Sequence, residues 1–171
     1  MRKAVCVLTN VSNKRIRGHI TFEEIRKNKR FSKLKITVNV TGLKPGRHGF
    51  HIHNTGDLRK GCSSLCSHFN PDNTKHGDIA NSKQHRHAGD LGNILADQNG
   101  NAQYTIYDKV IRLHGKYNII GRSVVIHSGR DDLGLGGLDK DGNIVDKKKH
   151  LESQKTGNAG SRIACGVIGI A

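Results

Sequence analysis

Histidine is the residue type whose number and spacing most clearly indicate chemistry in this sequence of 171 residues, which contains eleven of them. His51 and His53 are two positions apart in the segment Gly-Phe-His-Ile-His. Alternate side chains of a β-strand face the same side, so both imidazoles can reach one metal ion. Neutral imidazole binds copper and zinc well, and a carboxylate suits zinc. The pattern therefore predicts a metal site, for which the later candidate ligands are His68, His76, His85, His87, Asp90 and His127.

Other histidines and the cysteines carry a weaker signal. An isolated histidine is more often a surface or hydrogen-bonded structural residue, and we interpret His19, His114 and His150 in this way. His48 lies beside the paired histidines, and we expect it to hydrogen-bond the backbone rather than bind metal. The cysteines lack the paired spacing of a zinc finger. In an intracellular chain they are reduced thiols or metal ligands by default; they stand at positions 6, 62, 66 and 165.

Short strands are the elements that must position these side chains. Residues 33–40 alternate polar and apolar types, which predicts a strand with one buried face. That face consists of Leu34, Ile36, Val38 and Val40. Asn99-Gly100 predicts a hairpin turn between apolar segments. We expect no amphipathic helix longer than two turns, so the chain is predicted to be an all-β sandwich or flattened barrel. Further strands are expected at 4–8, 19–23, 102–107 and 123–127.

Two long segments do not fit a strand pattern, residues 54–89 and 128–160. Both are rich in Gly, Asn, Asp, Ser, Lys and His. Irregular loops longer than about 12–15 residues are uncommon unless they are functional or disordered. The first contains many potential metal ligands and the second directly follows His127, so we expect both to be functional. The length of the chain suggests a single domain, residues 1–171.

The charge of the chain is strongly positive. There are 29 Lys and Arg residues against 14 Asp and Glu, a formal net charge of +15. Such a balance favours anionic partners, from nucleic acids to small anions. Aromatic residues make up 4% and Trp is absent, which argues against a single-strand binder built on base stacking. No apolar stretch approaches the roughly 18 residues of a membrane span. The first residues also lack an export signal, so a cytoplasmic location is expected.

Motifs along essentially the whole chain resemble, in order, those of copper,zinc superoxide dismutases. The resemblance includes Gly-Phe-His-Ile-His at 49–53 and His-Phe-Asn-Pro at 68–71. It implies an eight-stranded Greek-key β-barrel, an immunoglobulin-like sandwich with a metal loop (54–89) and a channel loop (128–160). The other matching segments are 56–57, 75–77, 86–93, 121–127, 131–134 and 155–171.

The family resemblance also implies an activity, the conversion of two superoxide anions to dioxygen and hydrogen peroxide. In this family copper cycles between Cu(II) and Cu(I), zinc is structural, and a bridging histidine, here His68, supplies a proton. Each subunit holds one copper and one zinc ion. The implied copper ligands are His51, His53, His68 and His127. The implied zinc ligands are His68, His76, His87 and Asp90.

Further roles follow from the same resemblance. Asp131 matches a carboxylate that joins a copper-binding histidine, here His51, to a zinc-binding one, here His76. Cys62 and Cys165 match an intrasubunit disulfide.

The resemblance extends to the substrate and to partners. Arg162 matches the arginine that attracts and orients superoxide, and Lys155 and Thr156 match residues of the substrate channel. A homodimer is implied, although Thr55 replaces an apolar residue at the usual subunit contact. A copper chaperone is a further candidate partner.

Four alternatives remain open, two about residues and two about function. Cys66 can compete with Cys62 for Cys165, and His85 is an alternative zinc ligand to His87. A second class of function is copper delivery on a dismutase-like barrel, although such relatives typically lose ligands or the arginine. A third is polyanion binding, which the net charge favours but which leaves the ligand set unexplained. The basic insertion at about 138–150 is expected to be a solvated face.

Overall fold

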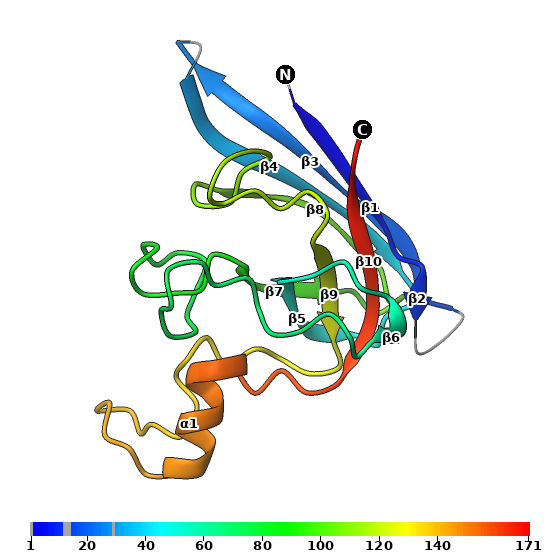
Figure 1. Ribbon diagram of the computed structural model, residues 1–171. Coiled ribbons are helices and arrows are strands. Elements are labelled where there is room, and N and C mark those ends of the chain that lie inside the picture. Colours follow the sequence, from blue (N-terminus) through cyan, green and yellow to red (C-terminus); the bar gives the residue numbers. More distant parts are fainter. Residues whose placement is uncertain (1, 12–14, 29) are drawn as a thin grey trace.

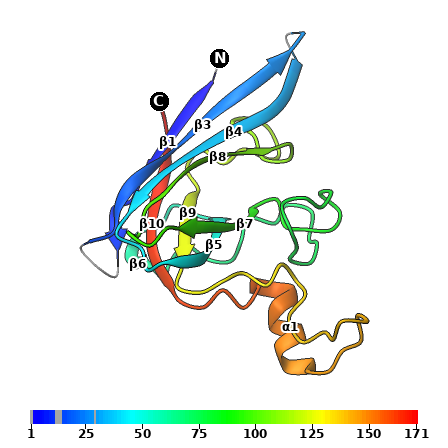
Figure 2. The same cartoon turned by 180° about the vertical axis from the view of Figure 1, so that it is seen from behind.

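Antiparallel strands form the wall of a nearly closed barrel, seen from opposite sides in Figures 1 and 2. This computed structural model describes residues 2–11, 15–28 and 30–171. The strand order around the barrel is β7-β5-β9-β10-β1-β3-β4-β8. The elements are β1 (Lys3–Val7), β2 (Asn10–Val11), β3 (Arg17–Lys27), β4 (Arg30–Thr41), β5 (Gly46–His53), β6 (Arg59–Cys62), β7 (Asp90–Ala96), β8 (Ala102–Asp108), β9 (Ser123–His127), α1 (Lys147–Thr156) and β10 (Arg162–Ile170).

Eight strands make the barrel wall among the described residues, which confirms the predicted all-β class. The first and last of these strands, β1 and β10, pair with each other, so the chain ends lie side by side (Figure 1). Non-sequential neighbours such as β5 with β9 create the crossovers of a Greek key. The two-residue strand β2 pairs with β10 outside this order.

The barrel interior is filled by the alternate apolar residues of its strands. Leu34, Ile36 and Val38 of β4 are at most 1% exposed, as the period-two pattern predicts. Phe22 of β3 and Phe50 of β5 are fully buried in the same core. Burying each large apolar side chain contributes about 1.5–3 kcal/mol, so this core is a main source of the stability of the barrel.

The predicted hairpin at Asn99-Gly100 is wrong in one respect. A tight turn does form, with Gly100 in the left-handed region at φ 80°. The Gly100 N–H donates to the Asp97 carbonyl at 3.0 Å. Among the described residues, however, β7 pairs with β5 and β8 pairs with β4, so the two strands that flank the turn share no ladder. They belong to opposite layers of the barrel, which the local turn pattern does not reveal.

The sequence predicts no amphipathic helix longer than two turns, and the helix that does form is polar rather than amphipathic. Helix α1 spans ten residues within the channel loop. Its residues are polar on nearly all sides and only Ser153 is buried, so apolar periodicity does not reveal it. Its ends are specified instead: the Asp146 side chain accepts from the Lys149 N–H at 2.9 Å, and Gly157 ends it at φ 67°.

The channel loop and the later part of the metal loop lie on the side of the molecule away from β1 and β3, whereas β6, early in the metal loop, lies beside β10 (Figures 1 and 2). Together the loops cover the end of β5, the strand that carries the paired histidines. Within the described residues, no helix has the length and apolar character needed to cross a membrane.

Candidate metal centre

Strand β5 carries the paired histidines. Its residues alternate between two faces, and Phe50 and Ile52 fill the barrel core. His51 and His53 therefore face the loops, which leave them 0% and 1% exposed. The neighbouring strand β9 runs antiparallel, with Phe50 opposite Ile126, and ends at His127.

Four imidazoles converge above these strands. Each of them offers one nitrogen, and these atoms all lie within 4.8 Å of one another. Three of the four, His51, His53 and His127, keep a buried ring nitrogen without a hydrogen-bond partner. A convergent set of ring nitrogens without hydrogen-bond partners fits the ligands of a bound metal ion. The members of this group are His51, His53, His68 and His127.

The ring orientations in this group are set by the other nitrogen of each histidine. His53 Nδ1 lies 2.9 Å from the Cys66 carbonyl oxygen, and His127 Nδ1 lies 3.0 Å from that of Gly160. Donation by these Nδ1–H groups leaves the Nε2 lone pairs free for a metal. Burial lowers the pKa of His51, His53 and His68, and it lowers the pKa of His127 to about 4. The group is therefore neutral at pH 7, the form that binds metal.

A second group adjoins the first and shares His68. The Nδ1 atoms of His68, His76 and His87 lie 2.8, 3.0 and 3.1 Å from Asp90 Oδ1. His68 Nδ1 and His87 Nδ1 are 3.4 Å apart. A tetrahedral zinc site with bonds of about 2.0–2.1 Å has ligand atoms roughly 3.3 Å apart, so these spacings suit a small tetrahedral ion.

His51 also comes near this second group, since it lies with His68, His76 and Asp90 in a set whose ligand atoms are within 4.8 Å of one another. Its Nε2, however, is only 2.6 Å from Asp131 Oδ2. The nitrogen that remains, Nδ1, is unpaired and serves the first group. His87 Nδ1, by contrast, lies 3.1 Å from Asp90 Oδ1 and 3.4 Å from His68 Nδ1, which places it beside the second group.

Asp131 connects the two groups. Its Oδ2 atom binds His51 Nε2, and its Oδ1 atom lies 2.8 Å from His76 Nε2. Burial lowers the pKa of His76, but hydrogen bonds to Asp131 and Asp90 outweigh burial and raise it to about 10. Burial raises the pKa of Asp90, but its three histidine partners hold it well below its usual range. A carboxylate thus lies beside each histidine of this second group.

Arg86 is a functional neighbour that sequence reasoning did not identify. It is 1% exposed, and its Nη1 donates to the Asp90 carbonyl at 2.9 Å. Its Nη2 pairs with Asp108 on the barrel wall. The arginine thereby anchors the end of the metal loop, including His87, to β8. The only signal in the sequence is its position next to His87.

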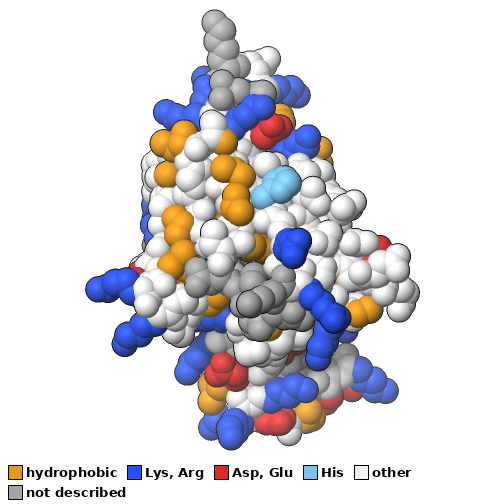
Figure 3. All heavy atoms as spheres, turned by 90° about the vertical axis from the view of Figure 1, so that its right-hand side faces the viewer, with side chains coloured by type: hydrophobic (Ala, Val, Ile, Leu, Met, Phe, Trp, Pro, Cys, Tyr) orange, Lys and Arg blue, Asp and Glu red, His pale blue; other side chains and the backbone are white. Residues whose placement is uncertain are grey.

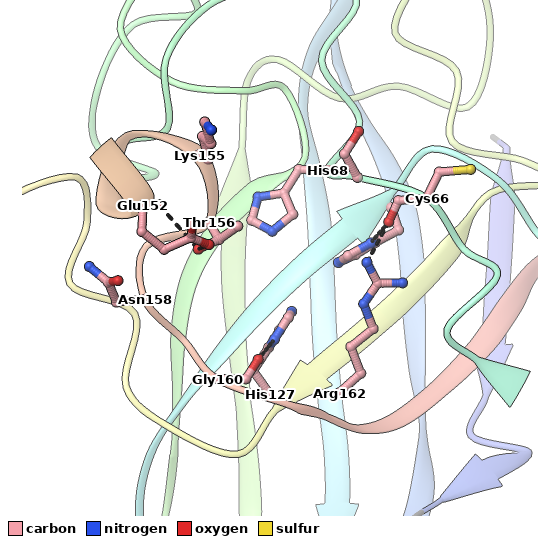
Figure 4. A pocket seen from close by; sticks show the side chains of 11 residues that line it. Cys66, His68, His127, Glu152, Lys155, Thr156, Asn158, Gly160 and Arg162 are labelled. Carbon is pink, nitrogen blue, oxygen red and sulfur yellow. Dashed lines mark hydrogen bonds between the residues drawn. The ribbon is translucent and has the colours of Figure 1, made fainter. Parts of the chain in front are cut away.

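A cavity of about 530 Å³ opens over the first group (Figure 4). Arg162, the first residue of β10, is the cross-strand partner of His127. Its guanidinium is held by the carbonyl oxygens of Cys62 at 2.7 Å and Cys66 at 2.6 Å. The last turn of α1 forms the opposite wall with Lys155 and Thr156. Positive charge therefore borders the path to the buried histidines.

The structure places the four cysteines in three settings. Cys62 and Cys165 are joined by a disulfide, which ties the metal loop to β10. Cys6 is a buried free thiol whose pKa is raised to about 12 by burial. Cys66 is free and exposed. The competition between Cys66 and Cys62 for Cys165 is thus resolved in favour of Cys62 in this structure.

The remaining histidines lie outside both groups. His85 is exposed, whereas His87, two residues later, is buried. His48 contacts the carbonyl oxygens of His127 and Lys44 at 2.7 and 2.8 Å, the backbone role expected of it. His150 contacts the Gly136 carbonyl oxygen at 3.0 Å and supports the channel loop.

The fold and the site together define a β-barrel metalloprotein with two adjoining, histidine-rich metal sites. Residues 16–168 match the family model described as copper/zinc superoxide dismutase. The chain belongs to the copper/zinc superoxide dismutase family.

Comparisons with individual proteins support membership of this family. A superoxide dismutase [Cu-Zn] of Paramecium bursaria Chlorella virus 1 is 52% identical over 91% of this chain and 74% of its own. An extracellular superoxide dismutase [Cu-Zn] of Drosophila melanogaster is 47% identical over 92% of this chain and 78% of its own. Among solved structures, the clock protein EA4 matches with a TM-score of 0.82 and 43% identity, over 99% of this chain and 94% of that one.

The choice between His87 and His85 can be tested directly. We expect His87→Ala to weaken zinc binding by about 10–100-fold or more, because it removes one of four ligands. His85→Ala is the matched control and should leave zinc affinity unchanged, since that side chain is exposed. A competition titration with a zinc chelator measures both. The reverse ranking would assign the ligand to His85.

Proposed function

We propose that this protein is a superoxide dismutase, in which two superoxide anions and two protons give dioxygen and hydrogen peroxide. The observation that carries the proposal is the pair of adjoining ligand groups that share His68 beneath a cavity bordered by Arg162. The family and the names of the relatives support the same activity. A copper-delivery role is less well supported, because the ligands and the arginine are all present.

The two groups suit two different metals. We assign copper to the group under the cavity and zinc to the group that contains a carboxylate, since imidazole suits copper and carboxylate suits zinc. The copper ligands are then His51, His53, His68 and His127, and the zinc ligands are His68, His76, His87 and Asp90. When bound, copper supplies one-electron redox chemistry and zinc, which is redox-inert, organises the site.

The side chains around the cavity perform the remaining tasks. Arg162 attracts the anion and orients it beside the histidines, while Lys155 adds positive charge and Thr156 restricts access. His68 is placed to hold a proton on its ring nitrogen at the cavity side, because its Nδ1 faces Asp90. Asp131 keeps His51 and His76 oriented through its two carboxylate oxygens.

Three wider assignments belong to the same proposal. We infer a homodimer, because apolar side chains gather on the face that carries β10 (Figure 3). Val7 of β1 and Val167 and Ile170 of the adjoining β10 are 55%, 36% and 81% exposed. We also infer that residues 1–171 act as one domain in the cytoplasm, although the Drosophila relative is named as extracellular. A copper chaperone remains a candidate partner.

Removing a copper ligand tests the proposed activity. His127→Ala should abolish superoxide consumption by protein loaded with copper and zinc, while the barrel stays folded, because His127 lies at the end of its strand. The exposed residue His19 provides the control, and His19→Ala should keep full activity. Elemental analysis must accompany the assay. Near-normal activity of copper-loaded His127→Ala would contradict the copper assignment.

The salt dependence of the rate tests electrostatic guidance. Salt screens exposed charges over about 8 Å at physiological ionic strength, so the rate should fall as salt rises. Arg162→Glu should slow the enzyme far more than neutralising Lys147, Lys148 and Lys149, which lie in the first turn of α1. The triple lysine variant should mainly flatten the salt dependence, as stopped-flow assays can show. An unchanged rate with salt, or a slower lysine variant, would contradict long-range guidance.

The dimer can be tested on the apolar face. Val167→Glu places a charge on exposed apolar surface of β10 and should convert a dimer to monomers in analytical ultracentrifugation. Leu95→Glu is a matched control, since Leu95 is a similarly exposed apolar residue, 55% exposed, on β7. That variant should remain dimeric. A monomeric wild-type protein at micromolar concentration would refute the proposed contact.

A further inference from the structure

The hairpin of β3 and β4 projects beyond the rest of the barrel, at the end of the molecule opposite α1 (Figures 1 and 2). The ladder between β1 and β3 ends at Glu23, and the ladder between β4 and β8 ends at Leu34. Beyond these points, β3 and β4 pair only with each other among the described residues. We call this two-stranded end of the hairpin, residues 25–27 and 30–33, the basic ribbon.

The charge of the chain is concentrated around this hairpin rather than around the cavity. Residues 25–33 contain five Lys and Arg residues and no acidic residue. Residues 1–41, which include β1 to β4, contain eleven Lys and Arg residues against two Glu, a net charge of +9 out of +15. The channel loop, residues 128–160, contains six of each sign. Because salt screens charge over about 8 Å, an excess at the far end of the barrel does little for an anion that enters the cavity.

Two cations face each other at the tip of the basic ribbon. Lys27 and Arg30 are cross-strand partners, both are exposed, and neither forms an ion pair with another described residue. Like charges directly opposite each other destabilise a β-ladder. Lys33 adds a third cation, whose Nζ lies 3.9 Å from the centroid of the Tyr107 ring. This arrangement costs stability in the free protein, and an anion that contacts these cations relieves the repulsion.

The base of the basic ribbon is anchored to the barrel. The guanidinium carbon of Arg112 lies 3.6 Å from the centroid of the Phe31 ring, which packs against the hydrophobic core. Arg26 Nη2 pairs with the buried carboxylate of Glu24 at 3.0 Å. These contacts fix the direction in which the ribbon projects, so its exposed cations are presented to a ligand without prior ordering.

We propose that the basic ribbon binds double-stranded nucleic acid by entering a groove, with Lys27, Arg30 and Lys33 contacting the phosphates. The major groove of B-DNA is about 12 Å wide and 8.5 Å deep and admits a two-stranded β-ribbon. Four strand residues span about 13 Å, so the ribbon is long enough to fill the depth of the groove. Phosphate contacts of this kind carry no sequence preference.

Other features of the ribbon favour a duplex over a single strand. Single-strand binders stack bases on exposed aromatic rings. Phe31 is the aromatic residue of the ribbon, and its ring is already covered by Arg112. The proposed binding is separate from the proposed dismutase function, because the ribbon and the cavity lie at opposite ends of the molecule (Figure 1).

Neutralising the ribbon tests the proposal against a control that removes the same charge elsewhere. The probe is a fluorescein-labelled DNA duplex of about 20 base pairs and mixed sequence, followed by fluorescence anisotropy between about 50 and 200 mM salt. All proteins are the full chain loaded with copper and zinc. The ribbon variant is Lys27→Gln/Arg30→Gln/Lys33→Gln. The control, at the other end of the molecule, is Lys147→Gln/Lys148→Gln/Lys149→Gln.

We expect the wild type to bind the duplex with a Kd of about 1–100 μM at physiological salt. The ribbon variant should bind at least about tenfold more weakly. The slope of log K against log salt concentration should become shallower by about 2–3, since each lost phosphate contact removes about 0.9. The control should stay within about twofold of the wild type, with the same slope. The charge-conserving variant Lys27→Arg/Lys33→Arg should bind like the wild type, and circular dichroism checks that each variant is folded.

Three results would overturn the proposal. The first is the absence of duplex binding by the wild type at about 50 mM salt. The second is equal weakening in the ribbon variant and the control, which would assign the binding to net charge alone. The third is a ribbon-dependent preference for another polyanion: stronger binding of the matched single strand, or binding of heparin or phosphatidylserine vesicles without binding of the duplex.

Discussion

The geometry of the metal centre depends on the two hydrogen bonds made by the carboxylate of Asp131. It hydrogen-bonds His51 on the barrel wall and His76 in the metal loop, and it belongs itself to the channel loop. Three segments distant in sequence are thereby joined at one buried group. Gly157 lies so close that a Cβ there would be 2.0 Å from Asp131 Oδ1, so helix α1 can end against the carboxylate only at a glycine. The same carboxylate consequently fixes the positions of the metal-group histidines, the channel loop and the end of α1 that forms a wall of the cavity.

The predictable parts of the molecule are those in which side chains repeat with a regular period or match family motifs. Strand β4 could be predicted because its inward residues alternate over its length, and the histidines because they cluster. The sequence could not reveal that β7 and β8 do not pair with each other. Each pairs instead with an earlier strand, β7 with β5 and β8 with β4. Helix α1 has no apolar face and is specified by its ends, Asp146 and Gly157.

Within the site, side-chain contributions were predictable and backbone contributions were not. The residues that offer imidazole or carboxylate groups can be identified from their types. His87 could be preferred to His85 from its motif context, and the structure adds that only His87 is buried beside Asp90. Cys66 contributes a carbonyl oxygen, a group that every residue possesses. The residue type therefore does not predict this carbonyl contact, and only the folded backbone shows it.

The polar character of α1 has a consequence for how the cavity behaves in time. The helix buries one side chain, Ser153, and is held by polar contacts such as that between Gln154 Nε2 and the Gly134 carbonyl at 2.8 Å. Few buried apolar contacts mean a small free-energy cost for local opening, whereas the barrel opens only with global unfolding. Amide hydrogens of α1 should therefore exchange with solvent much sooner than those of β4 or β5. One wall of the cavity can fluctuate while the metal ligands stay in place.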